Sequence, residues 1–276
     1  MRKLAIGTAL SGALALAGLA APAASAATST PDLKFTDVTV NHGKAIVVGT
    51  KTMSVPATYT LTRPVDVDIE GTKSFAGVIL YRGTLKTMQN MVGPDDDPTC
   101  TTTATTDTTV TESCSEKIVV DPTYGLFEAA DATTWKAGGF YTYADGTSSD
   151  DFLSYNSGTA IWGNLATAKV QRAARLTADA SPEPVVKGRT ITVKGKLTRA
   201  NWDSSTYKGY SGQKAVLQFR AEGSRTYTNV KAITSGTGGS LSTTVKASKS
   251  GYYRYVFAGT TTTAAATATG DYVKVK

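Results

Sequence analysis

A strict alternation of apolar and polar residues runs through the second half of the chain. In the stretch RTITVKGKL, Ile191, Val193 and Leu197 fall on one side, while threonine and lysine residues occupy the other. A period of two is that of a β-strand with one buried and one solvated face. Similar stretches follow, separated by GSR, GTGGS and SKSG: KAVLQFR, TYTNVKAI, SLSTTVKAS, YYRYVFA and DYVKVK. With an entry strand near residues 173–178, the pattern predicts about seven strands and an all-β sandwich.

Two phrases occur twice in the chain. GFYTY at residues 139–143 returns as GYYRY at residues 251–255. HGKAIVVG at residues 42–49 returns as KGRTITVKG at residues 187–195. The repeat predicts two tandem immunoglobulin-like β-sandwich domains. We place the domains at residues 27–172 and 173–276, after a signal peptide at residues 1–26. Little linker remains between them, so we expect a stiff tandem.

The first copy of the repeat is longer than the second. Gly43 and Gly139 lie 96 positions apart, whereas Gly188 and Gly251 lie 63 positions apart, so the first domain carries about 33 extra residues. We expect the insertion between residues 81 and 117, because this stretch contains PDDDP, both cysteines and a threonine-rich run.

The tyrosines of the repeated phrase have a structural interpretation. In immunoglobulin-like sandwiches, a tyrosine at the start of strand F bonds through its hydroxyl to upstream backbone, and the residue two places later faces the core. Tyr253 and Tyr255 fit these two positions, as do Tyr141 and Tyr143 in the first domain. We therefore predict two structural tyrosine corners. A repeated aromatic ligand site is the alternative.

The second half also resembles a known kind of module. LTADASPEPVVKGRTITVKGKLTRANW, GYSGQKAVLQFR and SGYYRYVFAGTTTT…GDYVKVK are similar to Ig-like modules in secreted proteins of actinomycetes such as Streptomyces. The resemblance covers essentially all of residues 173–276 and only the framing motifs of the first domain. It implies a β-sandwich and export. It transfers no catalytic residue, because proteins of this kind are largely uncharacterised.

The first residues of the chain predict export. Arg2 and Lys3 precede an apolar run over residues 4–20, and ASA at residues 24–26 is a cleavage signal. We expect cleavage after Ala26 and a mature chain outside the cell, without a membrane span. An uncleaved anchor helix is the alternative, but the run contains glycines and is short for a bilayer, which needs ~20 apolar residues.

The two cysteines, Cys100 and Cys114, enclose the stretch TTTATTDTTVTES. Threonine favours strands, and Asp107 lies at the midpoint, so we predict a hairpin that places the cysteines opposite each other. In an oxidising compartment such a pair forms a disulfide. A metal pair or a catalytic thiol would need further histidines or cysteines nearby, and the surrounding sequence has none.

Residue types needed for catalysis are scarce. His42 is the only histidine, and it precedes Gly43 in a predicted turn, so we assign it as a polar turn residue instead of a general base. The motifs GxSxG and HExxH and phosphate-binding glycine loops are absent from the sequence. Ser205–Lys208 matches SxxK but lacks the companion motifs of that pattern. We predict a protein that is not an enzyme and uses no cofactor.

Two acidic clusters could supply oxygen ligands for calcium. One lies in PDDDP and the other follows GTSS, and their members are Asp95, Asp96, Asp97, Asp150 and Asp151. Neither cluster has the glycine-spaced pattern of a calcium loop. We therefore predict no metal site and interpret both clusters as solvated acidic turns.

Three aromatic residues lie close together in NWDSSTYKGYSG: Trp202, Tyr207 and Tyr210. Exposed aromatic rings could stack on sugar rings, so the three are candidates for an aromatic binding surface. The alternative is that they fold over the open end of the sandwich and cover its core.

Charge is distributed unevenly between the halves. Residues 27–172 hold 11 Lys and Arg against 17 Asp and Glu, a net charge of −6, whereas residues 173–276 hold 16 against 5, a net charge of +11. Such asymmetry indicates contact with polyanions or membranes. Six cations at outward strand positions are the candidate polyanion-binding residues: Lys194, Lys196, Lys214, Arg220, Lys246 and Arg254.

The favoured function is therefore a secreted, non-catalytic interaction protein that binds anionic cell-wall polymers through its basic second domain. An exported protein meets such polymers first, so we expect no nucleic-acid partner. One alternative is a ligand-binding or inhibitor module that presents the disulfide-bridged loop to another secreted protein. Head-to-tail association of the acidic and basic domains, and a charge difference without a function, are further alternatives.

Overall fold

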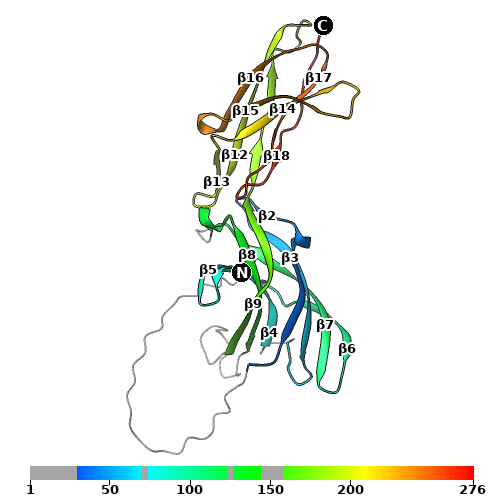
Figure 1. Cartoon of the computed structure of the whole chain (residues 1–276), viewed down its shortest axis with the longest axis vertical. Coiled ribbons are helices and arrows are strands. Elements are labelled where there is room, and N and C mark those ends of the chain that lie inside the picture. Colours follow the sequence, from blue (N-terminus) through cyan, green and yellow to red (C-terminus); the bar gives the residue numbers. More distant parts are fainter. Residues whose placement is uncertain (1–29, 70–73, 124–126, 144–157) are drawn as a thin grey trace, which may run out of the picture.

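The chain forms two β-sandwiches stacked end to end along one long axis (Figure 1). This computed structural model describes residues 30–69, 74–123, 127–143 and 158–276. The predicted all-β fold with two tandem immunoglobulin-like sandwiches is confirmed. The predicted signal peptide at residues 1–26 lies outside the described residues.

The first sandwich pairs a four-stranded sheet, in the order β1-β3-β7-β6, with a five-stranded sheet, in the order β2-β9-β8-β4-β5. In immunoglobulin letters these are A-B-E-D and A′-G-F-C-C′, which is the strand order of that fold. The strands are β1 (Lys34–Val40), β2 (Ile46–Val48), β3 (Met53–Pro64), β4 (Ser74–Thr84), β5 (Thr87–Val92), β6 (Thr99–Thr105), β7 (Thr109–Val120), β8 (Thr134–Tyr143) and β9 (Gly158–Arg172).

The second sandwich has the same plan without a strand D among its described residues, and its first sheet has five strands, most of them short. The long β12 pairs with β10, β11, β13 and β16, and the facing sheet has the order β15-β14-β17, with β18 and β19 both pairing with β17. These sheets correspond to A-B-E and C′-C-F-G. The strands are β10 (Ala174–Leu176), β11 (Asp179–Ser181), β12 (Thr190–Asn201), β13 (Thr206–Gly209), β14 (Lys214–Ala221), β15 (Thr228–Thr234), β16 (Ser240–Lys246), β17 (Gly251–Phe257), β18 (Ala266–Thr267) and β19 (Asp271–Val273).

The structure has more strands here than the seven expected, because the first and last strands are each interrupted and residues 206–209 add a short one. The alternation that predicted β12 is correct: Ile191, Val193 and Leu197 are fully buried, and Lys194 and Lys196 are exposed. In the first sandwich, strand β6 lies within the expected insertion. Its position is that of strand D, for which the second sandwich has no described equivalent.

Each sandwich has its own hydrophobic cluster, and two buried residues of the second sandwich, Ala200 and Trp202, lie in the cluster of the first. Trp202, which follows β12, is fully buried there. Its indole nitrogen donates to the carbonyl oxygens of Val48 at 3.3 Å and Gly49 at 2.9 Å, and its ring meets Phe127 edge-on at 5.4 Å. Trp202 therefore closes the open end of the first sandwich.

Backbone bonds reinforce this junction. The Arg172 amide donates to the carbonyl oxygen of Thr262 at 3.0 Å, and the Ala264 amide donates to the Arg172 carbonyl oxygen at 3.0 Å. The Gln171 side chain donates to the carbonyl oxygen of Thr260 at 2.8 Å. The end of β9 is thus bonded to the loop before β18, and the proposed domain boundary at residues 172 and 173 lies inside a packed junction.

Candidate binding surfaces

The disulfide lies between two neighbouring strands of the first sandwich. Cys100 on β6 pairs directly with Cys114 on β7, and their sulfur atoms are bonded. The hairpin turns as predicted around Asp107, where the Thr106 amide donates to the Thr109 carbonyl oxygen at 2.8 Å. The predicted disulfide and hairpin are confirmed. Residues 101–108 are all exposed, so the bridge holds an edge strand that has little other packing.

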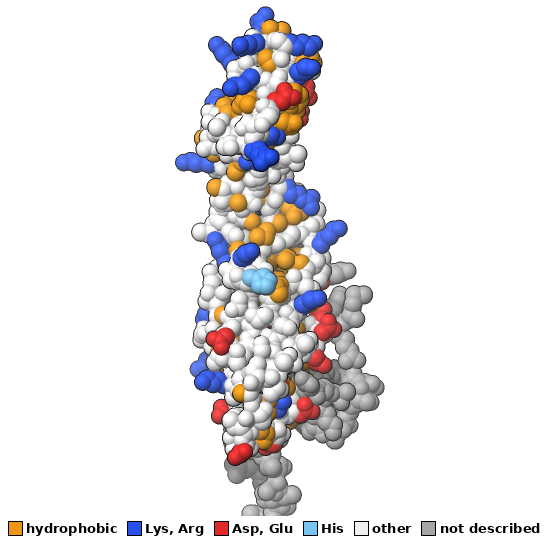
Figure 2. All heavy atoms as spheres, turned by 90° about the vertical axis from the view of Figure 1, so that its right-hand side faces the viewer, with side chains coloured by type: hydrophobic (Ala, Val, Ile, Leu, Met, Phe, Trp, Pro, Cys, Tyr) orange, Lys and Arg blue, Asp and Glu red, His pale blue; other side chains and the backbone are white. Residues whose placement is uncertain are grey.

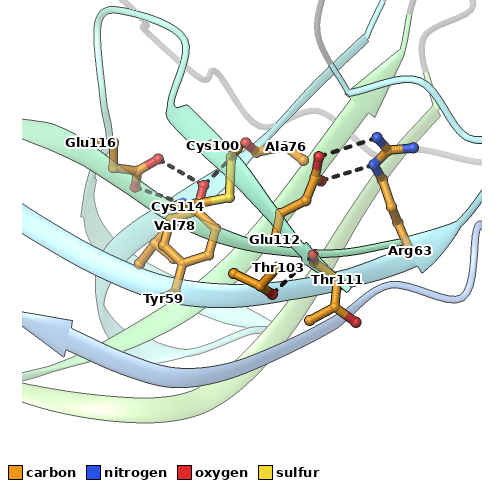
Figure 3. The surroundings of a disulfide bond; sticks show 10 residues. All are labelled: Tyr59, Arg63, Ala76, Val78, Cys100, Thr103, Thr111, Glu112, Cys114 and Glu116. Carbon is orange, nitrogen blue, oxygen red and sulfur yellow. Dashed lines mark hydrogen bonds and ion pairs between the residues drawn. A yellow bond between two sulfur atoms is a disulfide. The ribbon is translucent and has the colours of Figure 1, made fainter. Parts of the chain in front are cut away.

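Close to the disulfide, two polar side chains lie buried between the sheets (Figure 3). Glu116 on β7 accepts a bond from the Val78 amide at 2.8 Å, and the Tyr59 hydroxyl donates to Glu116 at 3.3 Å. The Tyr59 hydroxyl also lies 3.5 Å from the Ala76 carbonyl oxygen. Strand β5 pairs with β4 only from Leu80 onward, so the backbone groups of Val78 and Ala76 have no partner in β5. The side chains of Glu116 and Tyr59 bond to these groups instead.

Burial sets the protonation of this pair. Desolvation raises the pKa of Glu116 to about 7, although the bonds from Val78 and Tyr59 oppose the shift. Burial and the neighbouring carboxyl group also raise the pKa of Tyr59. The nearby Glu112 forms an ion pair with Arg63 at 3.0 Å. The Arg63–Glu112 ion pair lies within one sheet, whereas the bonds of Glu116 and Tyr59 to backbone groups of β4 connect the two sheets of the sandwich.

Sequence reasoning missed these acids, although a signal was present. Glu112 and Glu116 share the alternation of Cys114, Ile118 and Val120 along β7, and all five are buried. Carboxylates on the inward face of a strand indicate buried polar pairs, because an isolated buried charge is costly. The period of two thus predicts their burial, but not the groups that they bind.

Tyr253 and Tyr255 are buried, but their bonds differ from the prediction. The Tyr255 hydroxyl donates to the Val193 carbonyl oxygen on the opposite sheet at 2.7 Å. The ring of Tyr253 packs against Phe219, with ring centroids 4.8 Å apart. Both rings lie on the inward face of β17, and the backbone bond expected of Tyr253 is made by Tyr255.

In the first sandwich, Tyr141 is buried and Tyr143 is half-buried, and their ring centroids are 6.1 Å apart. Desolvation raises the pKa of Tyr141, and the negative charges of the nearby Tyr143 and Asp68 raise it further. Tyr141 and Tyr143 lie at the end of β8 and pair with the start of β4, whereas Tyr253 and Tyr255 lie near the start of β17 and pair with β14 toward its end, so the repeated phrase does not occupy equivalent positions in the two sandwiches. Their assignment as a corner stays a prediction.

The six candidate polyanion-binding cations lie on two different sheets. Lys194 and Lys196 on β12 and Lys246 on β16 share the outer face of one sheet, where Lys194 pairs with Ser242 and Lys246 with Thr190. The other three cations belong to the facing sheet, on strands β14 and β17: Lys214, Arg220 and Arg254. The two sets face opposite sides of the sandwich, so no single flat contact includes all six.

The two arginines of this set already have partners. Arg254 stacks on Tyr227 with the guanidinium 3.6 Å from the ring centroid, and Arg220 lies 4.1 Å from the ring centroid of Tyr252. Arg220 also donates to the carbonyl oxygen of Ser224 at 2.7 Å. Stacked arginines of this kind stabilise the outer face of the sheet. In the part of the chain that the structure describes, no carboxylate lies within 4.0 Å of the four lysines.

The three aromatic candidates do not form an exposed surface. Trp202 is buried in the junction, which corrects its assignment to a binding surface. Tyr207 packs against the first cluster and carries Arg175 over its ring at 3.6 Å. Tyr210 packs edge-on against Phe257 in the second cluster, at 5.9 Å between ring centroids. The alternative, that these rings cover the open end of the sandwich, describes the structure better.

The acidic residues considered as calcium ligands do not come together around a common point among the described residues. Asp95, Asp96 and Asp97 lie exposed in the turn before β6, while Asp150 and Asp151 lie outside the described residues. Across the described ranges, no group of three or more His, Cys, Asp or Glu side chains is placed to hold a metal ion. His42 is exposed in a short 3₁₀ turn, at a φ of 53°.

Neither a protein-family model nor a curated protein sequence matches the chain. Among solved structures, the full ectodomain (Ig1–Ig3) of mouse nectin-like molecule 4 is similar over 89% of this chain and 64% of that chain, at 13% identity and a TM-score of 0.22. The present chain thus spans 64% of the length of that ectodomain.

Two bacterial structures are also similar to the chain. The D00–D0 domain of intimin is similar over 86% of this chain and 98% of that one, at 11% identity and a TM-score of 0.26. A bacterial adhesin from Mobiluncus mulieris with intramolecular disulfide, isopeptide and ester-bond cross-links is similar over 82% and 79%, at 12% identity and a TM-score of 0.26. At TM-scores this low, the immunoglobulin-like assignment rests on strand order. No helix among the described residues is long and apolar enough to cross a membrane.

Proposed function

We propose that the protein is a secreted, non-catalytic interaction protein whose basic second sandwich associates with anionic polymers of the cell envelope. The observation that carries the proposal is the charge division, with a net charge of −6 in residues 27–172 and +11 in residues 173–276. On the face drawn in Figure 2, Lys and Arg side chains gather over the upper part of the molecule, and Asp and Glu predominate lower down. The disulfide and the predicted signal peptide support an extracellular location.

The physical basis is the attraction between exposed lysines and a polymer of fixed negative charge. The lysines on the outer sheet faces have no carboxylate neighbour within the described residues, so their charges are directed toward solvent and free to attract a polyanion. Attraction between exposed charges is screened by salt, with a Debye length of about 10 Å at 0.1 M. Binding through this sandwich should therefore be strong at low ionic strength and weak at high ionic strength.

Co-sedimentation of the mature chain with purified cell walls tests the proposal. The expected result is a bound fraction that falls steeply as sodium chloride is added, because each screened contact loses affinity. Walls stripped of their anionic polymers are the control and should retain little protein. Equal binding at low and high salt, or equal binding to stripped walls, would show that the electrostatic proposal is wrong.

A second candidate function, that of a ligand-binding or inhibitor module, is favoured by the disulfide-bridged hairpin. Residues 101–108 are exposed on β6 and its turn, and the Cys100–Cys114 bond ties β6 to β7 at the base of this hairpin. A constrained loop loses less conformational entropy when it binds a partner protein. The loop contains no Lys or Arg, so it offers no basic side chain to a trypsin-like pocket.

Substitution of Thr101 and Thr105 by Lys tests this alternative, because both side chains are exposed and make no cross-strand side-chain bond among the described residues. If the variant no longer captures a secreted protein that the parent captures, while its binding to cell walls is unchanged, the hairpin is supported as the binding surface. Retention of that protein by the variant would exclude it.

A further inference from the structure

We infer that the second sandwich contacts its polymer through its distal tip, the end remote from the junction, and not through its sheet faces. This inference rests on the proposed function and specifies where the contact is made. We define the distal tip as residues 185–189, 246–250 and 274–276. Figure 1 places this end, with the C-terminus, at the extremity of the molecule farthest from the first sandwich.

Backbone bonds hold the three segments of the distal tip together. The Lys187 amide donates to the Lys276 carbonyl oxygen at 3.0 Å, and the Val185 amide donates to the Lys274 carbonyl oxygen at 2.9 Å. The Gly188 amide donates to the Ala247 carbonyl oxygen at 2.7 Å. These bonds involve only the main chain, so the side chains of the tip are presented from a fixed scaffold.

The distal tip concentrates positive charge more than either sheet face does. Four carboxylates lie toward the same end: Glu183 precedes the first segment and lies near Asp179 and Asp271, and the amide of Glu222 donates to the Ser250 carbonyl oxygen at 3.0 Å. Against them stand six exposed cations in the three segments: Lys187, Arg189, Lys246, Lys249, Lys274 and Lys276. Like charges held this close repel one another, and a bound polyanion relieves that repulsion and releases its own counterions.

An open hollow with both polar and apolar lining adjoins these charges. Pro182, Pro184 and Val186 line it together with Arg189. Val186 is 61% exposed, the most exposed large hydrophobic side chain in the described part of the chain. An apolar wall beside cations fits a linear polymer that carries phosphate or carboxylate groups on a carbon backbone, because the anionic groups meet the cations and the backbone covers the apolar surface.

The sheet faces are less suited to such a polymer. The four exposed lysines among the predicted cations lie on opposite faces, and only Lys246 also belongs to the distal tip. One polymer strand cannot contact both faces without wrapping around the sandwich. At the tip, by contrast, three chain segments bring their cations to one end.

Two variants with equal loss of charge test the inference. The tip variant is Lys187→Gln/Arg189→Gln/Lys276→Gln, and the matched control is Lys208→Gln/Lys214→Gln/Lys231→Gln, whose lysines are exposed elsewhere on the same sandwich. The probes are poly(glycerol phosphate) and poly-L-glutamate, which both have carbon in the chain and which separate phosphate from carboxylate recognition. Affinity is measured at several salt concentrations on the full mature chain, and thermal unfolding shows whether both variants fold as the parent does.

The tip variant should bind at least one polymer roughly tenfold more weakly at low salt, with a shallower dependence on salt, and the control should lose far less. If polymer binding were weakened equally in the two variants, the distal tip would not be the contact surface, while the proposed function would remain. Failure of the parent chain to bind either polymer would overturn the proposed function, and the inference with it. Binding only to vesicles of phosphatidylglycerol would assign the tip to lipid and overturn the polymer contact.

Discussion

The carboxyl group of Glu116 satisfies the backbone where a strand partner is missing. It accepts the Val78 amide, and Tyr59 covers the neighbouring carbonyl of Ala76, so two side chains complete the hydrogen bonding of β4 beyond the end of β5. A buried carboxylate loses most of its hydration, and a neutral carboxylic acid loses much less. The fold therefore favours the protonated form of Glu116.

Stability should consequently depend on pH through Glu116. Its pKa is raised from 4.5 to about 7 on folding, so the native state binds more protons than the unfolded state between these values. The stabilisation is fully present below pH 4.5 and is lost as the pH rises through 7. A shift of this size corresponds to a loss on the order of 3 kcal/mol.

Glu116→Gln should remove this dependence. The amide oxygen can accept the Val78 amide, the amide nitrogen can donate to the Tyr59 hydroxyl, and that hydroxyl can then donate to Ala76. Urea unfolding from pH 4.5 to 8 should show the variant gaining stability over the parent as the pH rises. Parallel curves for the two proteins would show that Glu116 is not the titrating group.

At the scale of elements, β6 is the strand most dependent on a covalent bond. It is an edge strand that pairs only with β7, and its residues from Thr101 onward are exposed. Little apolar surface is buried by it, so hydrophobic packing contributes little to its position. The disulfide connects it to β7, which pairs with β3 along its whole length.

The double variant Cys100→Ala/Cys114→Ala should therefore be less stable by about 3 kcal/mol, the chain-entropy value for a loop of this size. Urea unfolding of the variant and of the reduced parent should give the same loss. Polymer binding should be unchanged, because the distal tip belongs to the other sandwich. A variant as stable as the oxidised parent would show that the hairpin is held by its strand pairing alone.

The elements also show what a sequence can predict here. Strand alternation and turn residues are local, so the hairpin at Asp107, the burial of Ile191 and the inward direction of Tyr255 follow from the residues themselves. The partner of Tyr255 is Val193, 62 positions away, and the partner of Glu116 is Val78, 38 positions away. Such pairs depend on how the sheets face each other, which alternation does not specify.

At the scale of the whole molecule, the decisive contact is the one between the sandwiches. Trp202 is separated by 154 positions from Val48, whose carbonyl it binds, so no local pattern could assign it to the first core. The distal tip could not be predicted from a local pattern either, because it is formed by three segments that are distant in sequence. The packed junction places the tip at the end of the molecule farthest from the first sandwich (Figure 1).

Trp202→Ala should loosen this arrangement. Removal of a fully buried tryptophan costs about 3–5 kcal/mol, and here it also removes the indole donor from the Gly49 carbonyl, while the Val48 carbonyl keeps the Ala173 amide. The loss should destabilise the first sandwich, although Trp202 belongs to the second. Small-angle scattering should change from that of one stiff rod to a broader distribution of end-to-end distances.

Trp162→Ala is the matched control, because Trp162 packs on Phe35 within the first sandwich at 5.5 Å and lies away from the junction. It should lower the unfolding temperature of the first sandwich while the scattering stays that of the rod. If Trp202→Ala left the scattering unchanged as well, the backbone bonds between β9 and the loop at residues 260–264 would be sufficient to hold the two sandwiches in line.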